Sequence, residues 1–211
     1  MNACPLCGRA SLLSFYQDRC RSYLRCDNCH LVLVPPEFLL SVEAEKAVYD
    51  QHQNDPADEN YRRFLSRVFD PLISQLPKGA RGLDYGCGPG PTISVMARES
   101  GLSVSNYDLY YQNTPEVLEH SYDFITITEV IEHVADAKGL LVLLNDLLRP
   151  GGILAVMTSR VGDEDTFGQW HYKNDPTHIR FYSIETFEWI ARYFDWQLEV
   201  VDKDVVFFYK K

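Results

Sequence analysis

Several features are missing from this 211-residue sequence, and each absence narrows the class of protein. No apolar run reaches the roughly 18 residues that a membrane-spanning helix requires. The first ten residues, MNACPLCGRA, lack the basic and then apolar pattern of a signal peptide. We therefore expect a cytoplasmic protein that has no membrane partner.

A clustered basic surface is also missing. The formal net charge is −10, and the short basic stretches CRSYLR and YRRF are isolated from each other. Tight binding to a phosphate backbone draws on lysine and arginine gathered on one face. The composition therefore disfavours nucleic acid as a partner and favours a small molecule or a protein.

The composition that remains is that of a globular protein. Apolar residues make up 45% of the chain and charged residues 24%, which is neither disordered nor fibrous. The length fits one ordinary domain together with a small module.

The small module is indicated by the cysteines. Two CxxC pairs, CPLC and CDNC, contain four of the six cysteines: Cys4, Cys7, Cys26 and Cys29. Each pair can direct two sulfurs at one ion, and two pairs complete a tetrahedral thiolate site for structural zinc. Four thiolates leave no open position for catalysis, so the predicted zinc ribbon (residues 1–35) should stabilise the fold or bind a protein partner. Cys20 lies outside both pairs, and we expect it to be a packed thiol.

Residues 36–78 read as a helical linker. They follow the turn sequence VPPE, and Ser41 is a good cap for a helix through SVEAEKAVYD. The stretch ENYRRFLSRVFDPLISQL has helical apolar spacing, and we expect Pro71 to kink or interrupt it.

A strand, a glycine loop and a helix follow in GARGLDYGCGPGPTISVMARESG. Asp84 ends the strand beside the loop, and Asp108 ends the next apolar stretch, where an acid can receive a ribose hydroxyl pair. A carboxylate beside the loop is a poor host for pyrophosphate but a good one for an ammonium group. S-adenosylmethionine carries both a ribose and an ammonium group. A nicotinamide-dependent oxidoreductase is a rival, which the glycine spacing and Asp84 disfavour.

Four segments in order, LDYGCGPG, NYD, YDFITITEVIEHV and LLRPGGILAVMTS, resemble class I S-adenosylmethionine-dependent methyltransferases. The chain is most similar to a subgroup with an N-terminal zinc ribbon and a late WHYKNDPTHIRFYS segment. The resemblance implies an α/β methyltransferase domain over residues 79–211. Its doubly wound, Rossmann-like sheet should be mostly parallel, with VVFFYK as an antiparallel last strand.

The same resemblance assigns cofactor-binding roles. The loop that faces the methionine end of the cofactor should consist of Gly86, Cys87, Gly88 and Gly90. Asp84 should hold the ammonium group, directly or through water, and Asp108 the ribose hydroxyls, with Leu109 beside the adenine. Thr128 and Glu129, at the end of the fourth strand, should face the cofactor and the reaction site.

The chain departs from the family between Asp108 and Asp123. The intervening residues are too few for the usual helix, third strand and acidic loop. We therefore expect an abbreviated third-strand region, without the acid that often receives the adenine amino group. A non-catalytic zinc-ribbon binding module with a degenerate cofactor pocket is the alternative function.

The stretch EVIEH gathers Glu129, Glu132 and His133 beside the predicted methyl donor. On an α-helix these three side chains would share one face. It is similar to the ExxEH segment of ubiquinone-biosynthesis O-methyltransferases and of small-RNA 2′-O-methyltransferases. That resemblance implies a divalent ion, such as Mg²⁺, held with a distant histidine, here His178. A metal-free acid–base role and a purely structural role remain alternatives.

The irregular stretch from Ser159 to Tyr182 is rich in aromatic residues. A long loop of this composition is usually functional rather than disordered. We interpret it as a lid over the acceptor, with Trp170, His171 and Tyr172 near the substrate, or alternatively as aromatic packing. The predicted enzyme methylates an oxygen or nitrogen of a small-molecule acceptor, and Glu129, Glu132, His133 and His178 are its candidate catalytic residues.

Overall fold

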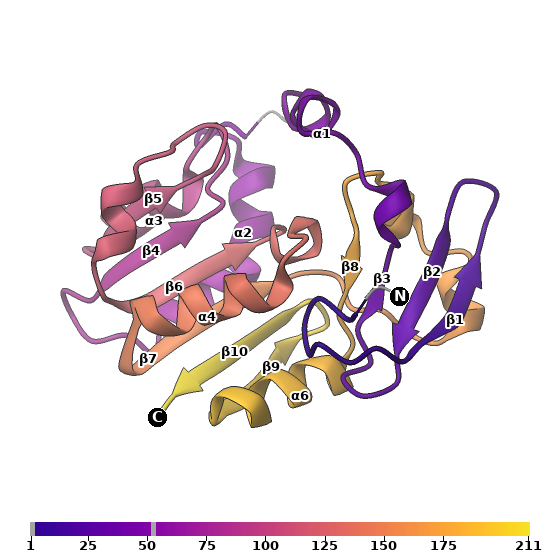
Figure 1. The fold of residues 1–211 in the computed structure, drawn as a ribbon. Helices are drawn as coiled ribbons and strands as arrows, with labels where there is room; N and C mark the ends of the chain where they lie inside the picture. The colour runs from indigo at the N-terminus through magenta and orange to yellow at the C-terminus, as the bar shows by residue number, and fades with distance from the viewer. Residues whose placement is uncertain (1–2, 52–53) are drawn as a thin grey trace.

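The computed structural model describes residues 3–51 and 54–211, which form two sheets that lie side by side (Figure 1). None of the helices in this described part of the chain has the length and apolar character that crossing a bilayer requires.

The larger sheet is doubly wound and has six strands. Their order is β5 (Ser103–Tyr107), β4 (Arg81–Tyr85), β6 (Tyr122–Thr128), β7 (Leu148–Met157), β10 (Val205–Lys210) and β9 (Trp196–Asp202). The first four strands are parallel, whereas β10 runs antiparallel to both of its neighbours. The predicted fold class, with VVFFYK as an antiparallel strand, is confirmed.

The connection from β5 to β6 is short, as the sequence predicts. It contains only the 3₁₀ turn η2 (Pro115–Glu119) and a bridge between Asp108 and Gln112. The larger sheet therefore ends at β5 in the described part of the chain.

Helices cover both faces of this sheet because alternate residues of a strand point to opposite sides. On one side α4 (Ala137–Leu147) and α6 (Ile184–Phe194) pack on Ile125 and Ile127 of β6. On the other, α2 (Glu59–Ile73) packs on Phe124 and on α3 (Thr92–Glu99). The expectation that Pro71 interrupts α2 is wrong. The helix continues to Ile73, so Pro71 lies in its last turn, where few further helical bonds remain to be lost.

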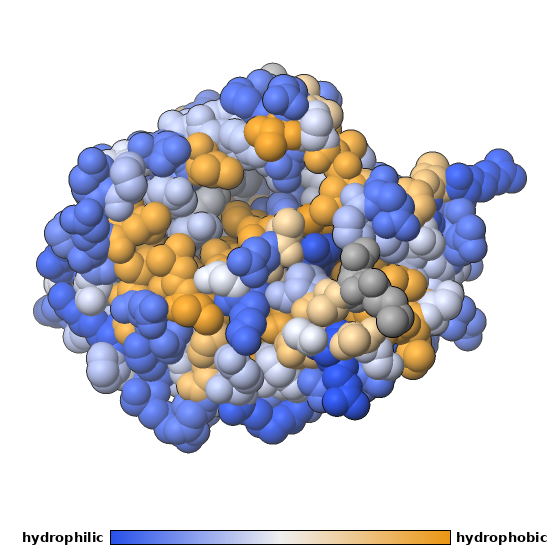
Figure 2. All heavy atoms as spheres, in the orientation of Figure 1, coloured by the Kyte–Doolittle hydropathy of each residue, from blue (hydrophilic) through white to orange (hydrophobic). Residues whose placement is uncertain are grey.

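Between the two sheets the chain forms a strap consisting of the 3₁₀ turn η1 (Pro36–Phe38) and the helix α1 (Val42–Tyr49). Ser41 caps α1 by accepting a hydrogen bond from the Ala44 amide at 3.3 Å, as predicted. No side chain of α1 is buried. The face of the molecule below α1 is hollowed (Figure 2).

The smaller sheet joins the cysteine-rich segment to the late part of the chain. Its order is β1 (Leu12–Gln17), β2 (Ser22–Cys26), β3 (Val32–Leu33) and β8 (Arg180–Phe181). The pairing of β3 with β8 is antiparallel, with Val32 opposite Phe181. The predicted ribbon therefore shares a sheet with residues that the sequence assigned to the methyltransferase domain.

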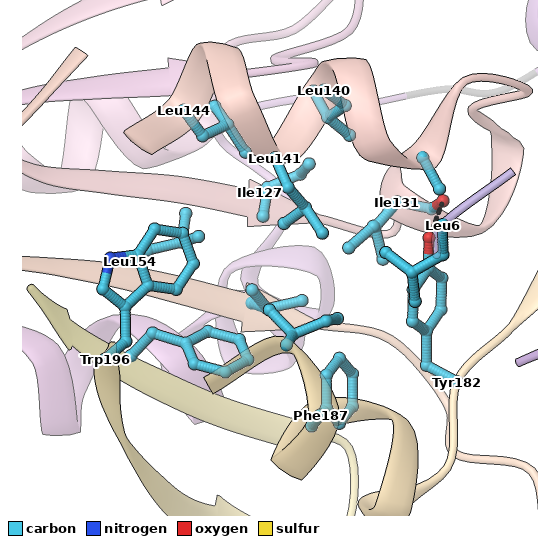
Figure 3. Close-up of a cluster of buried hydrophobic side chains, with 14 of the residues drawn as sticks. Leu6, Ile127, Ile131, Leu140, Leu141, Leu144, Leu154, Tyr182, Phe187 and Trp196 are labelled. Carbon is cyan, nitrogen blue, oxygen red and sulfur yellow. Dashed lines mark hydrogen bonds between the residues drawn. The ribbon is translucent and has the colours of Figure 1, made fainter. Parts of the chain in front are cut away.

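The first CxxC loop is also anchored in the main core. Leu6 is 1% exposed and belongs to the cluster that contains Ile131, Leu140 and Tyr182 (Figure 3). The carbonyl of Pro5 in the same loop accepts a hydrogen bond from the amide of Lys138 at 3.0 Å. The cysteine-rich segment is thus packed against the helix that follows the EVIEH stretch.

Candidate active site

A cavity of about 670 Å³ opens at the carboxyl ends of β4, β5 and β6. In open α/β sheets this edge is where ligands bind. The cavity wall contains many of the residues predicted from the sequence, namely Gly86, Gly88, Asp108, Leu109, Thr128, Glu129, His133 and His178. The predicted cofactor loop and the predicted acceptor residues therefore share one cavity.

The glycine loop divides into two pairs of residues. Gly86 and Gly88 have φ of +80° and +65° and line the cavity. Gly90 instead lies against the backbone of Asn54, and an added Cβ would come within 1.5 Å of its carbonyl oxygen. The thiol of Cys87 turns toward the Gln112 side chain, at 3.3 Å. Two of the four predicted loop residues thus face the cavity, whereas the other two pack the loop.

Asp108 ties the glycine loop to the loop that follows β5. One carboxylate oxygen accepts the Gly88 amide at 3.0 Å, and the other accepts the amides of Tyr110 and Tyr111 at 2.8 and 3.0 Å. The neighbouring Leu109 is 60% exposed at the cavity edge. Asp108 is therefore a carboxylate fixed at the cavity wall by backbone donors.

Asp84 lies outside the cavity wall. It is 4% exposed and accepts a hydrogen bond from the Thr126 hydroxyl at 2.8 Å. Burial raises the pKa of its carboxyl to about 7. The predicted contact of Asp84 with an ammonium group remains a prediction.

The EVIEH stretch is not α-helical, so its three side chains do not share a helix face. Glu129 has a φ of +53°, and Ile131–His133 form only the 3₁₀ turn η3. A residue with positive φ is itself outside an α-helix, and this conformation is uncommon for a residue other than glycine. Strain of this kind is concentrated at functional sites.

The turn nevertheless gathers a possible set of metal ligands. Ligand atoms of Glu132, His133 and His178 lie within 4.8 Å of one another. Nδ1 of His133 lies 3.1 Å from the carbonyl oxygen of Thr177, and Nδ1 of His178 lies 2.7 Å from that of Tyr172. A carbonyl only accepts, so each Nδ1 carries a hydrogen, which leaves Nε2 as the ring nitrogen that can bind a metal ion. Nε2 of His133 lies 4.0 Å from a carboxylate oxygen of Glu132.

Tyr172 connects the two glutamates of the stretch. Its hydroxyl forms hydrogen bonds with Glu132 and, at 3.0 Å, with Glu129, and lies 3.1 Å from the Thr158 hydroxyl. Burial raises the pKa of Glu132 to about 7, and burial together with the charge of Glu132 raises the pKa of Glu129 to about 8. Glu132 is fully buried, and its second oxygen has no hydrogen-bond partner among the described residues.

The 170–179 segment contributes to the site differently from the predicted lid. Asp175, Pro176, Thr177, His178 and Ile179 line the cavity, whereas Trp170, His171 and Tyr172 do not. The ring of Trp170 packs on those of Tyr172 and Phe167 behind the wall, and His171 is exposed. Burial lowers the pKa of His178 to about 4, so its ring is neutral near pH 7.

Sequence reasoning missed the strap at the cavity mouth. Glu45 lines the cavity and accepts hydrogen bonds from Tyr110 and Tyr49, at 2.7 and 3.0 Å. Tyr111 donates to Asp50 at 2.8 Å. The adjacent tyrosines after Asp108 and the acidic residues of α1 were the available signals, but only the fold shows that they meet.

The four paired cysteines converge, as predicted. Their sulfurs lie within 4.8 Å of one another, with Cys4 to Cys29 at 3.5 Å and Cys7 to Cys26 at 3.4 Å. Sulfurs in a tetrahedral zinc site with bonds of about 2.3 Å are separated by roughly 3.8 Å, so the donor set fits zinc. Cys20 is exposed, so the expectation of a packed thiol is wrong.

Comparisons with known proteins identify the family to which this chain belongs. Residues 52–201 match the family model described as a methyltransferase domain. This match covers more than half of the chain, which therefore belongs to this methyltransferase family. The predicted class, S-adenosylmethionine-dependent methyltransferase, is confirmed at the level of the family.

Curated relatives include ubiquinone biosynthesis O-methyltransferases. The protein from Cereibacter sphaeroides is 30% identical over 136 residues, covering 51% of this chain and 53% of the relative. The protein from Dinoroseobacter shibae is 33% identical over 107 residues, covering 38% and 42%. This chain thus spans about half the length of the curated relatives that it matches.

Solved structures support the fold. CalO1, a methyltransferase in calicheamicin biosynthesis, has a TM-score of 0.54 at 11% identity, covering 81% of this chain and 59% of CalO1. An O-methyltransferase family protein from Burkholderia thailandensis has a TM-score of 0.50 at 14% identity, with coverage of 83% and 61%. The finer subgroup, with its ribbon and DPTH segment, remains a prediction.

Proposed function

We propose that this protein transfers a methyl group from S-adenosylmethionine to an oxygen of a small-molecule acceptor. We further propose that a divalent cation such as Mg²⁺, held by Glu132, His133 and His178, binds the acceptor. The sequence left oxygen and nitrogen open as the methylated atom. Similarity to ubiquinone biosynthesis O-methyltransferases favours oxygen.

One half of the cavity has features that suit the cofactor. Gly86 and Gly88 line the cavity, and the carboxylate of Asp108 lies at the wall beside them. The buried hydroxyl oxygen of Thr128 has no hydrogen-bond partner among the described residues and lies on the same cavity. These groups would hold the ribose and methionine parts of the cofactor, whose sulfonium supplies an electrophilic methyl group.

The observation that carries the proposal is the cluster formed by Glu132, His133 and His178. Two imidazole rings are oriented by backbone carbonyls, and a ring nitrogen of each lies within 4.8 Å of the other and of a carboxylate oxygen of the buried Glu132. Hydrogen bonding of the second ring nitrogen is the usual way in which proteins orient metal-bound histidine. Two nitrogens and carboxylate oxygens suit Mg²⁺, Mn²⁺ or Zn²⁺, and a cation would satisfy the free oxygen of Glu132.

Glu129 is placed to accept the proton of an acceptor hydroxyl. It lines the cavity beside His133, and its raised pKa of about 8 is near the range in which a general base works best. Tyr172 holds its carboxylate from behind, at 3.0 Å. Holding the acceptor in line with the donor would supply much of the rate.

The four cysteines would hold a structural zinc ion. All four positions of a tetrahedral ion would be filled by Cys4, Cys7, Cys26 and Cys29, so this zinc would take no part in the chemistry. We also propose a cytoplasmic location. A protein partner for the ribbon is a second, independent possibility that the same cysteines permit.

The test is transfer of a labelled methyl group from S-adenosylmethionine to a panel of hydroxyl-bearing aromatic acceptors. The zinc-loaded protein is assayed with added Mg²⁺ or Mn²⁺, and again after EDTA at a concentration that leaves the ribbon zinc in place. The proposal predicts transfer that requires the added cation.

Activity that survives the chelator would remove the metal while leaving the methyltransferase assignment intact. Absence of cofactor binding by the folded, zinc-loaded protein would instead favour the non-catalytic binding module.

A further inference from the structure

The guanidinium of Arg21 donates hydrogen bonds to three backbone carbonyls of the distant segment 173–176. Arg21 directly precedes β2, at the end of the turn that joins β1 to β2, and it is 8% exposed. Its Nη2 donates to the carbonyl oxygens of Lys173 and, at 2.7 Å, Asp175, while its Nη1 donates to that of Pro176 at 3.3 Å. One buried side chain of the cysteine-rich segment thus holds the segment that leads into β8.

These three carbonyls lie between the two that orient the histidines. The carbonyl of Tyr172, which precedes Lys173, accepts Nδ1–H of His178 at 2.7 Å. The carbonyl of Thr177, which follows Pro176, accepts Nδ1–H of His133 at 3.1 Å. A shift of the backbone held by Arg21 would therefore move both orienting acceptors.

The hairpin holds the same segment by a second contact. Asp18 receives a hydrogen bond from the ammonium group of Lys173 at 2.9 Å, and Lys173 is 5% exposed. The Nε of Arg21 donates to the hydroxyl of Tyr23 at 2.9 Å, which fixes the plane of the guanidinium. A planar fork with several donors in fixed directions is suited to holding several acceptors, whereas the ammonium group of a lysine is a point charge on a flexible stem.

We propose that Arg21 is a positioning residue for the acceptor half of the site, and that this is a role of the cysteine-rich segment. The proposal deepens the function proposed above and rests on it. Arg21 neither lines the cavity nor hydrogen-bonds the three proposed cation ligands, and it acts through the carbonyls on either side of those that it holds.

The test compares Arg21→Met with Arg25→Met in the zinc-loaded protein. Arg25 lies in the neighbouring strand β2, is exposed, and forms a side-chain hydrogen bond with the ring of His30. Hydrogen exchange is followed by mass spectrometry in peptides that cover residues 172–179 and, as an internal reference, in peptides from β6 and β7. We expect exchange in 172–179 to become at least tenfold faster in Arg21→Met alone, with the reference peptides unchanged.

Two functional readouts separate positioning from general destabilisation. Affinity for S-adenosylmethionine should stay within about twofold of wild type, because the glycine loop and Asp108 are untouched. The kcat for methyl transfer should fall about tenfold to a hundredfold, as expected for a small misplacement of reacting groups. Arg21→Lys keeps the positive charge without the fork and should give intermediate values for both exchange and kcat.

Unchanged exchange in 172–179, or faster exchange throughout the protein in both Arg21 variants, would overturn the proposal. The exchange experiment needs no turnover. If Arg21→Met shows the local effect but the wild-type protein transfers no methyl group, the proposed function is contradicted. The hold of Arg21 on residues 173–176, which we call the Arg21 clamp, would still stand.

Discussion

His178 donates its Nδ1 hydrogen to the carbonyl oxygen of Tyr172, at 2.7 Å, while the hydroxyl of the same tyrosine bonds Glu129 and Glu132. One residue thus orients a histidine with its backbone and two carboxylates with its side chain. Because Tyr172 is held in the aromatic cluster with Trp170, at a ring separation of 5.0 Å, the polar site has a rigid apolar support.

This arrangement predicts the effect of removing His178. His178→Ala should abolish stimulation by divalent cations, because one of three converging ligands is lost, while cofactor affinity stays within about twofold. His171→Ala is the matched control, since His171 is exposed and lies outside the cavity. Titration of each variant with Mn²⁺, followed by electron paramagnetic resonance, measures the site directly. Equal Mn²⁺ binding by the two variants would remove His178 from the set of ligands.

Asp108→Ala should weaken S-adenosylmethionine binding by at least tenfold. The carboxylate faces the cavity, and it also accepts three backbone amides that set the shape of the glycine loop. Loss of these bonds should lower the free energy of unfolding by about 1–2 kcal/mol. Calorimetry and urea denaturation measure the two effects, with the distant Asp146→Ala as control. An unchanged affinity would rule out the ribose assignment.

Tyr110→Phe should make cofactor dissociation several-fold faster. The strap helix α1 buries no side chain, so its position over the cavity depends on polar contacts such as that of Tyr110 with Glu45 at 2.7 Å. Segments held by few buried contacts open easily. Stopped-flow displacement of bound cofactor measures the rate, and Tyr193→Phe, on the exposed face of α6, is the control. Identical dissociation rates would mean that the strap does not retain the cofactor.

Asp84 predicts a pH-dependent stability. Its folded-state pKa of about 7 lies above its ordinary value of 3.8, so between these values the folded protein binds more protons than the unfolded chain. The free energy of unfolding contributed by Asp84 should therefore fall as the pH rises from 4 to 7, by up to about 4 kcal/mol. Asp84→Asn should remove that dependence. Urea denaturation at pH 5 and pH 8 measures the change in the free energy of unfolding for both proteins. An equal change in wild type and Asp84→Asn would contradict the prediction.

The sequence predicted those features that depend on local patterns. Apolar runs located β4, β6 and β10, glycines with a following helix located the cofactor loop, and the cap residue Ser41 located the start of α1. Paired cysteine spacing predicted a convergence that the fold reproduces. These patterns are local because backbone conformation and capping depend on near neighbours.

Contacts between distant segments could not be read in the same way. The pairing of Val32 with Phe181, the Arg21 clamp and the Glu45–Tyr110 contact each depend on how separate elements pack. The left-handed Glu129 is a further example, since an extended strand has to turn sharply there for Glu132 to enter the core. Tertiary packing overrides the helical pattern that the residues suggest.

The most direct test of the account is a calorimetric titration of the zinc-loaded protein with S-adenosylmethionine. The cavity beside Gly86, Gly88 and Asp108 predicts saturable binding at one site, despite the short connection between β5 and β6. Absence of heat, together with no shift in the melting temperature on adding the cofactor, would contradict the proposed methyltransferase function. That result would favour the non-catalytic zinc-ribbon binding module.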